Sequence, residues 1–593
     1  MRYFALATDY DGTLARHGRV DAATLQALGR LAATGRRLIL VTGRELPDLQ
    51  RVFPELDRFD LVVAENGALL YTPATRATRL LAAEPAPAFV SELTRRGVAP
   101  LSVGSCIVAT WHPQETTVLE VIRELGLELH VIFNKGAVMV LPAGVNKATG
   151  LLAGLEALGL SPHNVVAIGD AENDHALLHA AEVSVAVANA VPMLKAGADC
   201  VTSASHGAGV AELIDELIES DLANRPTRGT RRTLLLGTRA DGAEVRIPAA
   251  GRSILVAGTS GSGKSTLTAS LLEQLMAERY QCCVVDPEGD YDELPDMIVF
   301  GSVEHPPGVT EVMTALERPD ASVVVNLLGV KLQDRPAFFA RLLMRIQEER
   351  ARTGRPHWLL VDEAHHLVPA DWQSAPLTLT QALGSIIYVT VHPDALAPAA
   401  LENIDVVAAL GETPHKAVAA AANASRRGAP ADSGGKADGG GARAAFDADA
   451  RQPLEPGHAL VWIPGAINQA MPIAVAQSHR ERRRHLRKYA KGELGPDRSF
   501  FFRGPGNRLK LRAQNLVTFL QLAEGVDEET WLHHLRNGDY SQWLATCIKD
   551  EALAEEVRQV ERTAPDLGAA QSLAHIRAAI EQRYTLPEKA GVL

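Results

Sequence analysis

The sequence predicts an α/β protein in which two successive regions each build a mainly parallel sheet, followed by a mainly helical C-terminal part. Short apolar segments alternate with helical patterns over residues 1–220 and again over 234–478, and this alternation is typical of βαβ units. After residue 478 the apolar residues recur mainly at helical spacing. The chain has 593 residues, enough for three or four domains at roughly 150 residues each.

The first region is expected to be a Rossmann-like core with a small inserted module. Its clearest strands are expected at residues 3–8, 37–42, 61–66, 165–170 and 183–188. Between 73 and 145 the pattern changes to the strand-like and helical pieces of a small α+β cap. The core is therefore expected to consist of 1–72 and 146–220, and the polar, basic stretch 221–233 is expected to be a linker.

The second region, 234–478, repeats the alternation. Strands are expected at residues 253–258, 282–288, 322–327, 357–363 and 385–391. The Gly-, Ala- and Asp-rich stretch 424–450 has little to bury, and we expect a flexible loop there. The basic run 479–492 opens the helical domain 479–593; it is either a solvated helix face or a surface that touches nucleic acid or supplies an arginine to a neighbouring subunit.

Composition excludes several classes of protein. The net charge of −12 argues against a protein that binds nucleic acid non-specifically through its overall charge. A local basic patch could still bind nucleic acid. The five cysteines show no zinc-binding spacing. No apolar run approaches the roughly 20 residues that span a membrane, and the N-terminus lacks the pattern of a signal peptide. We expect a cytoplasmic protein without a membrane partner.

Polar residues stand at the expected strand ends of the first region and at the start of one helix. In chain order they are Asp9, Asp11, Thr42, Lys147, Asp170 and Asp174. Because the carboxyl ends of parallel strands meet in one crevice, these residues are expected to converge. One carboxylate can attack a phosphoryl group, and an acid two residues on can protonate the leaving alkoxide and then activate water. Mg²⁺ prefers such hard oxygen ligands, so the pattern predicts magnesium-dependent phosphoester chemistry.

The segments that carry these residues are DYDGTLA, VTGR, ENGALLY, NKATGL and GDAENDHALL. Their order resembles the haloacid dehalogenase superfamily of phosphohydrolases, in its Cof-like, type IIB branch, over residues 3–218. The resemblance implies that Asp9 is the nucleophile and Asp11 the general acid/base. It implies that Thr42 and Lys147 hold the transferring phosphoryl group.

The same resemblance implies a metal site and a substrate-selecting cap. Asp9, Asp170 and the main chain at Asp11 would hold Mg²⁺, and Asp174 would support the metal or the lysine. Arg44, in the TGR turn, is a candidate contact to a second anionic group of the substrate. In the cap, four residues are either substrate contacts or ordinary core and surface side chains: Trp111, His112, His130 and Lys135. These residues do not identify the substrate.

The second region contains a phosphate-binding loop. ILVAGTSGSGKSTLTASLL has an apolar strand, a glycine-rich loop and a helix in the required order. The loop N–H groups would cradle phosphates, Lys264 would reach the β- and γ-phosphates, and the Ser265 hydroxyl would bind Mg²⁺. The residues expected to bind ATP are Gly258, Thr259, Ser260, Gly261, Ser262, Gly263, Lys264, Ser265 and Thr266.

A second apolar strand, in HWLLVDEAHHLVP, ends in two acids. Asp362 is expected to help bind Mg²⁺, and Glu363 is placed to polarise an attacking water, which favours ATP hydrolysis over transfer to a bound hydroxyl. A third strand ends at Thr390 and His392. These are either a γ-phosphate sensor or ordinary strand-end residues.

Together, AGTSGSGKST, VVDPEGDY and LLVDEAHHL resemble the HerA/FtsK group of ring-forming ATPases over roughly 234–475. The resemblance implies a hexamer with ATP at subunit interfaces and an arginine supplied in trans. The C-terminal part resembles a helical domain of unknown function.

Three functions follow from these patterns. The leading one is a bifunctional enzyme, in which a phosphatase with a phosphorylated substrate of unknown identity is fused to an ATPase that uses Mg²⁺ and ATP and is expected to form a hexamer. The second is a polynucleotide kinase–phosphatase. The third is a DNA- or protein-remodelling ATPase whose phosphatase fold is regulatory.

Overall fold

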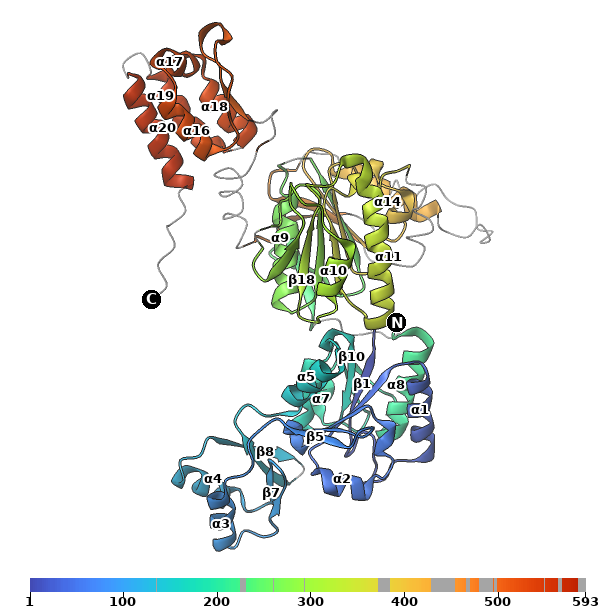
Figure 1. Ribbon diagram of the computed structural model, residues 1–593. Coiled ribbons are helices and arrows are strands. Elements are labelled where there is room, and N and C mark those ends of the chain that lie inside the picture. Colours follow the sequence, from blue (N-terminus) through green and yellow to red (C-terminus); the bar gives the residue numbers. More distant parts are fainter. Residues whose placement is uncertain are drawn as a thin grey trace. The chain divides into compact units, whose positions relative to one another are not determined.

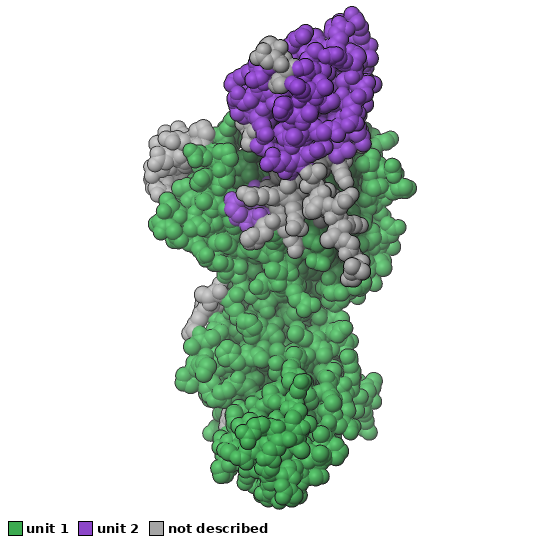
Figure 2. Space-filling model, turned by 90° about the vertical axis from the view of Figure 1, so that its left-hand side faces the viewer, with its two compact units in different colours: residues 1–264, 271–476 green, residues 265–270, 477–593 purple. Residues whose placement is uncertain are grey.

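The computed structural model describes most of the chain. The described residues are 1–134, 136–223, 231–259, 261–292, 294–371, 384–427, 454–464, 470–478, 494, 499–548, 550–563 and 568–584. They form two compact units, one of residues 1–264 and 271–476 and one of residues 265–270 and 477–593 (Figure 2). Among the described helices, none is both long and apolar enough to cross a bilayer.

The first sheet of the larger unit has eight described strands. Their order is β12 (Cys200–Val201), β11 (Val183–Ala186), β10 (Val165–Gly169), β1 (Ala5–Asp9), β2 (Arg37–Val41), β3 (Leu61–Ala64), β4 (Leu69–Thr72) and β5 (Ala77–Leu80). The strands from β12 to β3 are parallel, whereas β4 and β5 are antiparallel. The flanking helices are α1 (Ala22–Ala33), α2 (Leu46–Val52), α5 (Lys147–Leu158), α6 (His175–Ala180), α7 (Pro192–Gly197) and α8 (His206–Ser220). The α/β core expected from the alternating pattern is confirmed.

Burial explains why β1 lies in the middle of this sheet. All five of its residues are buried, as expected for a parallel strand covered on both faces. Because β10 and β2 pair with β1 on either side, the polar residues that follow these three strands lie at one edge of the sheet.

The cap is an antiparallel sheet covered by two helices. The strand order is β6 (Ser102–Val103), β7 (Val108–Trp111), β9 (Ala137–Pro142) and β8 (Leu129–Asn134). The helices α3 (Pro87–Arg95) and α4 (Glu115–Glu124) lie beside this sheet (Figure 1). Their residues Phe89, Leu93, Val118 and Val121 form a buried cluster with Val108 of β7 and Val140 of β9. Strand β5, within the range expected for the cap, instead extends the core sheet through β4, because the Thr72–Ala77 turn folds it back as a hairpin.

A buried carboxylate joins the cap to the core. Glu65, which follows β3, is fully buried and accepts hydrogen bonds from the main-chain N–H groups of Ser105, Cys106 and Ile107 at 2.9, 2.7 and 3.1 Å. Three charge-assisted hydrogen bonds stabilise the buried anion. They fix the loop between β6 and β7 against the core.

The second sheet of the larger unit has eleven described strands. Their order is β14 (Glu244–Pro248), β13 (Thr233–Thr238), β23 (Met471–Val475), β22 (His458–Trp462), β21 (Val406–Leu410), β15 (Ser253–Gly258), β20 (Ile386–Thr390), β19 (Trp358–Val361), β16 (Cys282–Asp286), β18 (Ser322–Asn326) and β17 (Met297–Phe300). The strands from β21 to β17 are parallel. The associated helices are α9 (Lys264–Ala277), α10 (Val309–Leu316), α11 (Arg335–Thr353), α13 (Pro398–Leu401) and α14 (Pro414–Arg427).

The two α/β regions of this unit meet at Glu182, which directly precedes β11. Its side chain is 5% exposed and is held from both regions. His163 Nδ1 lies 2.8 Å and the Tyr280 hydroxyl 3.0 Å from Oε2, while Arg2 donates to Oε1 at 2.9 Å and the guanidinium of Arg232 lies 3.6 Å away. Burial alone would raise the pKa of Glu182, but the hydrogen bond and charge of His163 and the two guanidinium groups lower it to about 2.

The smaller unit is mainly helical. After a hairpin of β24 (Phe500–Phe502) and β25 (Leu511–Ala513), its elements are α16 (Leu516–Gly525), α17 (Glu528–Asn537), α18 (Asp539–Trp543), the π-helical turn Leu544–Ile548, α19 (Glu551–Arg562) and α20 (Ala569–Tyr584). Its core is aromatic: Phe500, Phe502, Phe519, Trp531, Tyr540 and Trp543 are buried and lie within ring-contact distance. The expected helical part is thus confirmed, with a two-stranded hairpin added.

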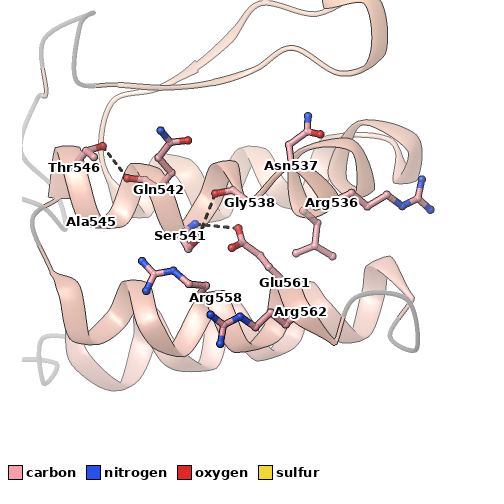
Figure 3. Close-up of a pocket in the computed structure, with 11 residues that line it drawn as sticks. Arg536, Asn537, Gly538, Ser541, Gln542, Ala545, Thr546, Arg558, Glu561 and Arg562 are labelled. Carbon is pink, nitrogen blue, oxygen red and sulfur yellow. Dashed lines mark hydrogen bonds between the residues drawn. The ribbon is translucent and has the colours of Figure 1, made fainter.

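A groove of about 500 Å³ lies between α18 and α19 (Figure 3). Glu561 is one of the lining residues, and its carboxylate accepts a hydrogen bond from the main-chain N–H of Ser541 at 3.0 Å. Arg558 and Arg562 both face Glu555. The groove therefore carries acidic and basic groups together.

Three sequence expectations fall wholly or largely outside the described residues. They concern most of the 221–233 linker, the 424–450 loop beyond the end of α14, and the basic run 479–492. At the described end of the expected linker, Arg231 donates to the carbonyls of His179, Ala181 and Glu182.

Candidate active sites

A buried lysine links two aspartates at the carboxyl edge of the first sheet. Asp9 ends β1, and Lys147 is the first residue of α5, whose N-cap Asn146 accepts hydrogen bonds from the main-chain N–H groups of Ala148 and Thr149. Lys147 Nζ donates to Asp9 Oδ1 at 2.5 Å and to Asp174 Oδ1 at 2.6 Å. The three side chains are at most 5% exposed. This arrangement brings together groups 165 positions apart in the chain.

Both carboxylate oxygens of Asp174 accept hydrogen bonds within the site. Its second oxygen accepts hydrogen bonds from the main-chain N–H groups of Asp170 and Ala171, both at 2.9 Å. One of its oxygens therefore holds the lysine and the other holds the loop after β10. Asp170, by contrast, accepts from the hydroxyl of Thr13 at 3.1 Å through Oδ1.

The oxygens of Asp9, Asp170 and Asp174 form the one group in the described residues that meets the geometry of a metal site, with all three lying within 4.8 Å of one another. Three buried carboxylates match the hard oxygen donors that Mg²⁺ requires. Because both oxygens of Asp174 are engaged, the donor set fits a cation held chiefly by Asp9 and Asp170.

Burial and like charge shape the electrostatics of this cluster. Burial and the negative charge of Asp174 raise the pKa of Asp9 to about 8, against the opposing effect of Lys147. Burial lowers the pKa of Lys147, but the charges of Asp174 and Asp9 outweigh this and raise it overall. A bound cation would favour the ionised carboxylate that nucleophilic attack requires.

Asp11 points to a different partner. Its carboxylate forms a two-bond pair with Arg44, with distances of 2.6 Å to Nε and 2.7 Å to Nη2. Arg44 also donates to Asp48 at 2.6 Å, and its guanidinium lies 5.5 Å from the centre of the Tyr10 ring. The hydrogen bonds to Asp11 raise the pKa of Arg44. Arg44, which was expected to contact the substrate, is therefore paired with Asp11, the candidate acid/base residue.

Thr42 lies directly after β2 and is fully buried. Its hydroxyl accepts from the main-chain N–H of Arg44 at 3.1 Å, and its carbonyl accepts from that of Asn66 at 2.9 Å. Asn66 has a left-handed backbone with φ of 55°, and its amide accepts from Asn173 at 3.2 Å. Asn66, Asn173 and the Thr13 hydroxyl were not predicted from the sequence, although all three lie inside the segments that carry the predicted residues.

The four cap candidates have different surroundings. Trp111 is 53% exposed, and His112 is half-exposed with Nδ1 2.9 Å from Glu115. His130 is half-buried on β8, and its Nδ1 is buried without a hydrogen-bond partner. Lys135 lies outside the described residues.

The phosphate-binding loop connects β15 to α9. Lys264, the first residue of α9, donates to the carbonyls of Gly258 and Thr259 at 2.9 and 3.1 Å. Gly263 has φ of 100°, and a Cβ on Gly258 would lie 2.5 Å from the Leu410 carbonyl oxygen, so both positions require glycine. Ser265 and Thr266 lie in the first turn of α9, Gly261 and Ser262 in the loop, and Ser260 outside the described residues.

Strand order brings the other candidate ATPase residues beside this loop. Because β20 lies between β15 and β19, the residues after all three strands share one edge. Asp362 follows β19 and accepts from the main-chain N–H of Glu363 at 3.0 Å, and Glu363 has a left-handed backbone with φ of 40°. At the end of β20, Thr390 accepts from the main-chain N–H of His392 at 3.0 Å.

His365 joins these two strand ends and was not predicted from the sequence. Its Nδ1 lies 3.1 Å from the Thr390 hydroxyl and 3.4 Å from the Glu363 carboxylate, and its ring is 5.3 Å from that of His392. Burial and the nearby histidines lower the pKa of His365 to about 4. The feature of the sequence that could have indicated His365 is its position two residues after Glu363.

Asp286, in the segment VVDPEGDY, is a second buried residue near the phosphate-binding loop that had no predicted role. It ends β16, is fully buried and accepts from the main-chain N–H groups of Glu288, Gly289 and Tyr291. Burial and the charge of Asp362 raise the pKa of Asp286 to about 7.

Comparison with known proteins places the first region in a family. The model of the haloacid dehalogenase-like hydrolase family matches residues 6–104 and 108–214. A phosphoglycolate phosphatase of Methanothermobacter thermautotrophicus is 34% identical over 219 residues, covering 35% of this chain and 96% of the relative. The chain belongs to the haloacid dehalogenase-like hydrolases.

Other hydrolases of this family resemble the same region. A phosphoglycolate phosphatase of Halorubrum lacusprofundi is 33% identical over 223 residues, covering 36% of this chain and 96% of the relative. The crystal structure of a haloacid dehalogenase-like hydrolase from Bacteroides thetaiotaomicron is 20% identical, covers 36% of this chain and 99% of that chain, and has a TM-score of 0.33.

The second region resembles a different protein class. The model described as the central domain of the helicase HerA matches residues 235–345. This range includes the phosphate-binding loop and β16, whereas Asp362 and Glu363 lie beyond it. The chain thus combines a haloacid dehalogenase-like hydrolase region with a HerA-like region.

Proposed function

We propose that the first region is a magnesium-dependent phosphatase for small phosphorylated carboxylic acids, of which 2-phosphoglycolate is the candidate substrate. The observation that carries this proposal is the buried contact of Lys147 with Asp9 and Asp174 at the sheet edge. The substrate is suggested by the phosphoglycolate phosphatases that cover the whole of this region.

The side chains support a two-step hydrolysis. Asp9 would attack phosphorus and form an aspartyl-phosphate while the bond to the ester oxygen breaks and Asp11 protonates that oxygen. Asp11 would then take a proton from water, whose oxygen attacks phosphorus and releases phosphate and Asp9. Thr42 and Lys147 would hold the phosphoryl oxygens.

Two further roles follow from the contacts. Mg²⁺, held by Asp9, Asp170 and the main chain at Asp11, would supply positive charge against the phosphoryl oxygens. Asp174 would keep Lys147 in place. Arg44 can reach substrate only by releasing Asp11, so we propose that it orients Asp11 between the two proton transfers.

The test is phosphate release from 2-phosphoglycolate by the full-length protein. We expect hydrolysis with Mg²⁺ and none with EDTA, restored by added Mg²⁺. Hydrolysis that persists in EDTA would contradict the metal assignment. Inactivity of the protein on a panel of phosphomonoesters would favour the regulatory interpretation of this region.

We further propose that the second region hydrolyses ATP. Gly258 to Thr266 would bind the phosphates, and Ser265 and Asp362 would hold Mg²⁺. Glu363 would polarise the attacking water, and His392 would contact the γ-phosphate. The proximity of Glu363, His365 and Thr390 supports a water-activating site rather than a site for a hydroxyl acceptor.

Substitution of Lys264 by alanine is expected to lower ATP hydrolysis at least about a hundredfold, because the γ-phosphate loses its nearest cation. The measurement is ADP formation at saturating ATP. Phosphatase activity in the same preparation is the control and should be unchanged. An unaltered ATPase rate would contradict the role of this loop.

Hexamer formation, an arginine in trans and a nucleic-acid client remain predictions. Native mass measurement with ATP tests the ring, and a monomeric mass would contradict it. Transfer of labelled γ-phosphate to a 5′-hydroxyl oligonucleotide would favour the polynucleotide kinase–phosphatase instead.

A further inference from the structure

His365 lies between the ends of two neighbouring strands of the second sheet. It belongs to the 3₁₀ turn Ala364–His366, which directly follows Glu363 and contacts β20. The main-chain N–H of His366 donates to the Glu363 carbonyl at 2.9 Å and holds this turn. Only 12% of the His365 side chain is exposed. The imidazole is thus fixed beside the residues expected to act on ATP.

The contacts of the ring determine which of its nitrogens carries the proton. Nδ1 lies 3.1 Å from the Thr390 hydroxyl and 3.4 Å from the Glu363 carboxylate. An ionised carboxylate only accepts hydrogen bonds, so an unprotonated Nδ1 would bring its lone pair against those of Glu363. A protonated Nδ1 instead donates to the Thr390 hydroxyl and places its positive hydrogen near Glu363. The proton is therefore assigned to Nδ1.

The ring is neutral near pH 7. Burial and the charges of His366, His392 and Lys264 lower the pKa of His365 to about 4. The influence of Lys264 indicates that the ring lies close to the phosphate-binding loop. A neutral imidazole has one proton to donate, and it adds no positive charge that would compete with Lys264 for the phosphates.

Thr390 can accept the proton of Nδ1 without losing its other contact. Its hydroxyl is fully buried and accepts from the main-chain N–H of His392 at 3.0 Å. A hydroxyl oxygen has two lone pairs, so it can accept both hydrogen bonds and still donate its own proton to a third group. Because β20 lies between β15 and β19, Thr390 stands between the phosphate-binding loop and Glu363 along the sheet edge.

Glu363 has a backbone conformation that needs support. Its φ of 40° lies in the left-handed region, which is unfavourable for a residue with a side chain. Such a conformation persists only where the surrounding contacts fix it. The hydrogen bond from the His366 N–H and the nearby Nδ1 of His365 are two such contacts.

We propose that His365 is a positioning residue for ATP hydrolysis, an inference that rests on the proposed ATPase function of the second region. Its Nδ1–H fixes the Glu363 carboxylate and the Thr390 hydroxyl relative to each other. The acid that polarises the attacking water is thereby held in register with a strand end beside the phosphates. His365 acts through Glu363 and needs no contact with ATP, so its loss should slow the chemical step and leave ATP binding intact.

The experiment measures kcat and KM for ADP formation by the full-length protein with Mg²⁺. For His365→Leu we expect kcat to fall about tenfold or more while KM for ATP stays within about twofold. His365→Asn has nearly the shape of the leucine variant, but its amide can donate from the position of Nδ1, so kcat should return to within about threefold of wild type. His366→Leu is the matched control, because that ring lies 4.0 Å from the His365 ring between centres, and it should leave both constants nearly unchanged.

A double substitution tests whether His365 acts through Glu363. Glu363→Gln removes the acid that polarises water, and single-turnover ADP formation measures the remaining rate. Adding His365→Leu to this protein should cause less than about a threefold further loss, because coupled residues are not additive. Binding of a fluorescent ATP analogue to each variant confirms that the site is folded.

Several results would overturn the inference. They are an unchanged kcat in His365→Leu, a loss in His365→Asn equal to that in His365→Leu, an equal loss in His366→Leu, a weakening of ATP binding that accounts for the loss, and a full additional loss in the Glu363→Gln protein. Each of these in a wild-type protein that hydrolyses ATP leaves the ATPase in place. Wild-type protein that forms no ADP overturns the proposed ATPase function and the inference together.

Discussion

Replacing Asp9 with asparagine is expected to lower phosphate release from 2-phosphoglycolate by at least about a thousandfold, because the amide cannot form the phosphoryl-enzyme. The asparagine has nearly the same shape and can still accept the hydrogen bond from Lys147, so the fold should persist. The measurement is kcat at saturating substrate and Mg²⁺.

Two comparisons sharpen this test. Asp60→Asn, the same change beside the opposite end of β2, where the carboxylate accepts from the Leu38 N–H at 2.9 Å, should leave kcat nearly unchanged. Asp11→Asn should slow the hydrolysis of 2-phosphoglycolate much more than that of p-nitrophenyl phosphate, whose leaving group needs little protonation. A fully active Asp9→Asn protein would show that another group attacks phosphorus.

Replacing Glu182 with glutamine is expected to lower the free energy of unfolding by about 3 kcal/mol at pH 7. The change removes the one negative charge that Arg2, Arg232 and His163 share in a buried setting. The measurement is the urea midpoint of the full-length protein followed by circular dichroism.

The effect of Glu182 should depend on pH in a defined direction. Its pKa is about 2 in the folded protein, below the value of about 4.3 in an unfolded chain. The contribution of Glu182 to stability is therefore fully present above about pH 5 and is lost as the pH falls through 4 toward 2. The difference between wild type and Glu182→Gln should shrink over that window.

Glu244→Gln is the control for this prediction. Glu244 pairs with Arg246 at 2.7 Å, but 53% of its side chain is exposed, so its loss should cost under about 1 kcal/mol. Equal destabilisation by the two variants, or a Glu182 effect that does not change with pH, would contradict the role of the buried charge cluster.

Much of the fold could be predicted because the parallel strands are short apolar runs buried on both faces. The expected strands near Ala5–Asp9, Val165–Gly169 and Ser253–Gly258 agree with the structure to within a few residues. The hairpin of β13 and β14 was not among the expected strands, and β13 begins at Thr233, the last residue of the expected linker.

The candidate phosphatase residues were also predictable, since each follows a strand or opens a helix in a parallel sheet. That rule anticipated the contact of Asp9 with Lys147 and Asp174. It could not anticipate that Arg44 pairs with Asp11, because an arginine in a turn has the same local pattern whether it faces substrate or a neighbouring acid.

The sequence by itself determined the order of the α/β regions and the positions of the two candidate phosphate sites, because glycine loops, capping residues and apolar strands act over a few neighbouring positions. Only the tertiary structure decided that β20 separates β15 from β19, that Arg44 pairs with Asp11, and that Glu182 is enclosed by both regions. These features depend on strand order and on contacts between residues far apart in the chain. The free energy of such contacts comes from burial and charge pairing, which no local pattern records.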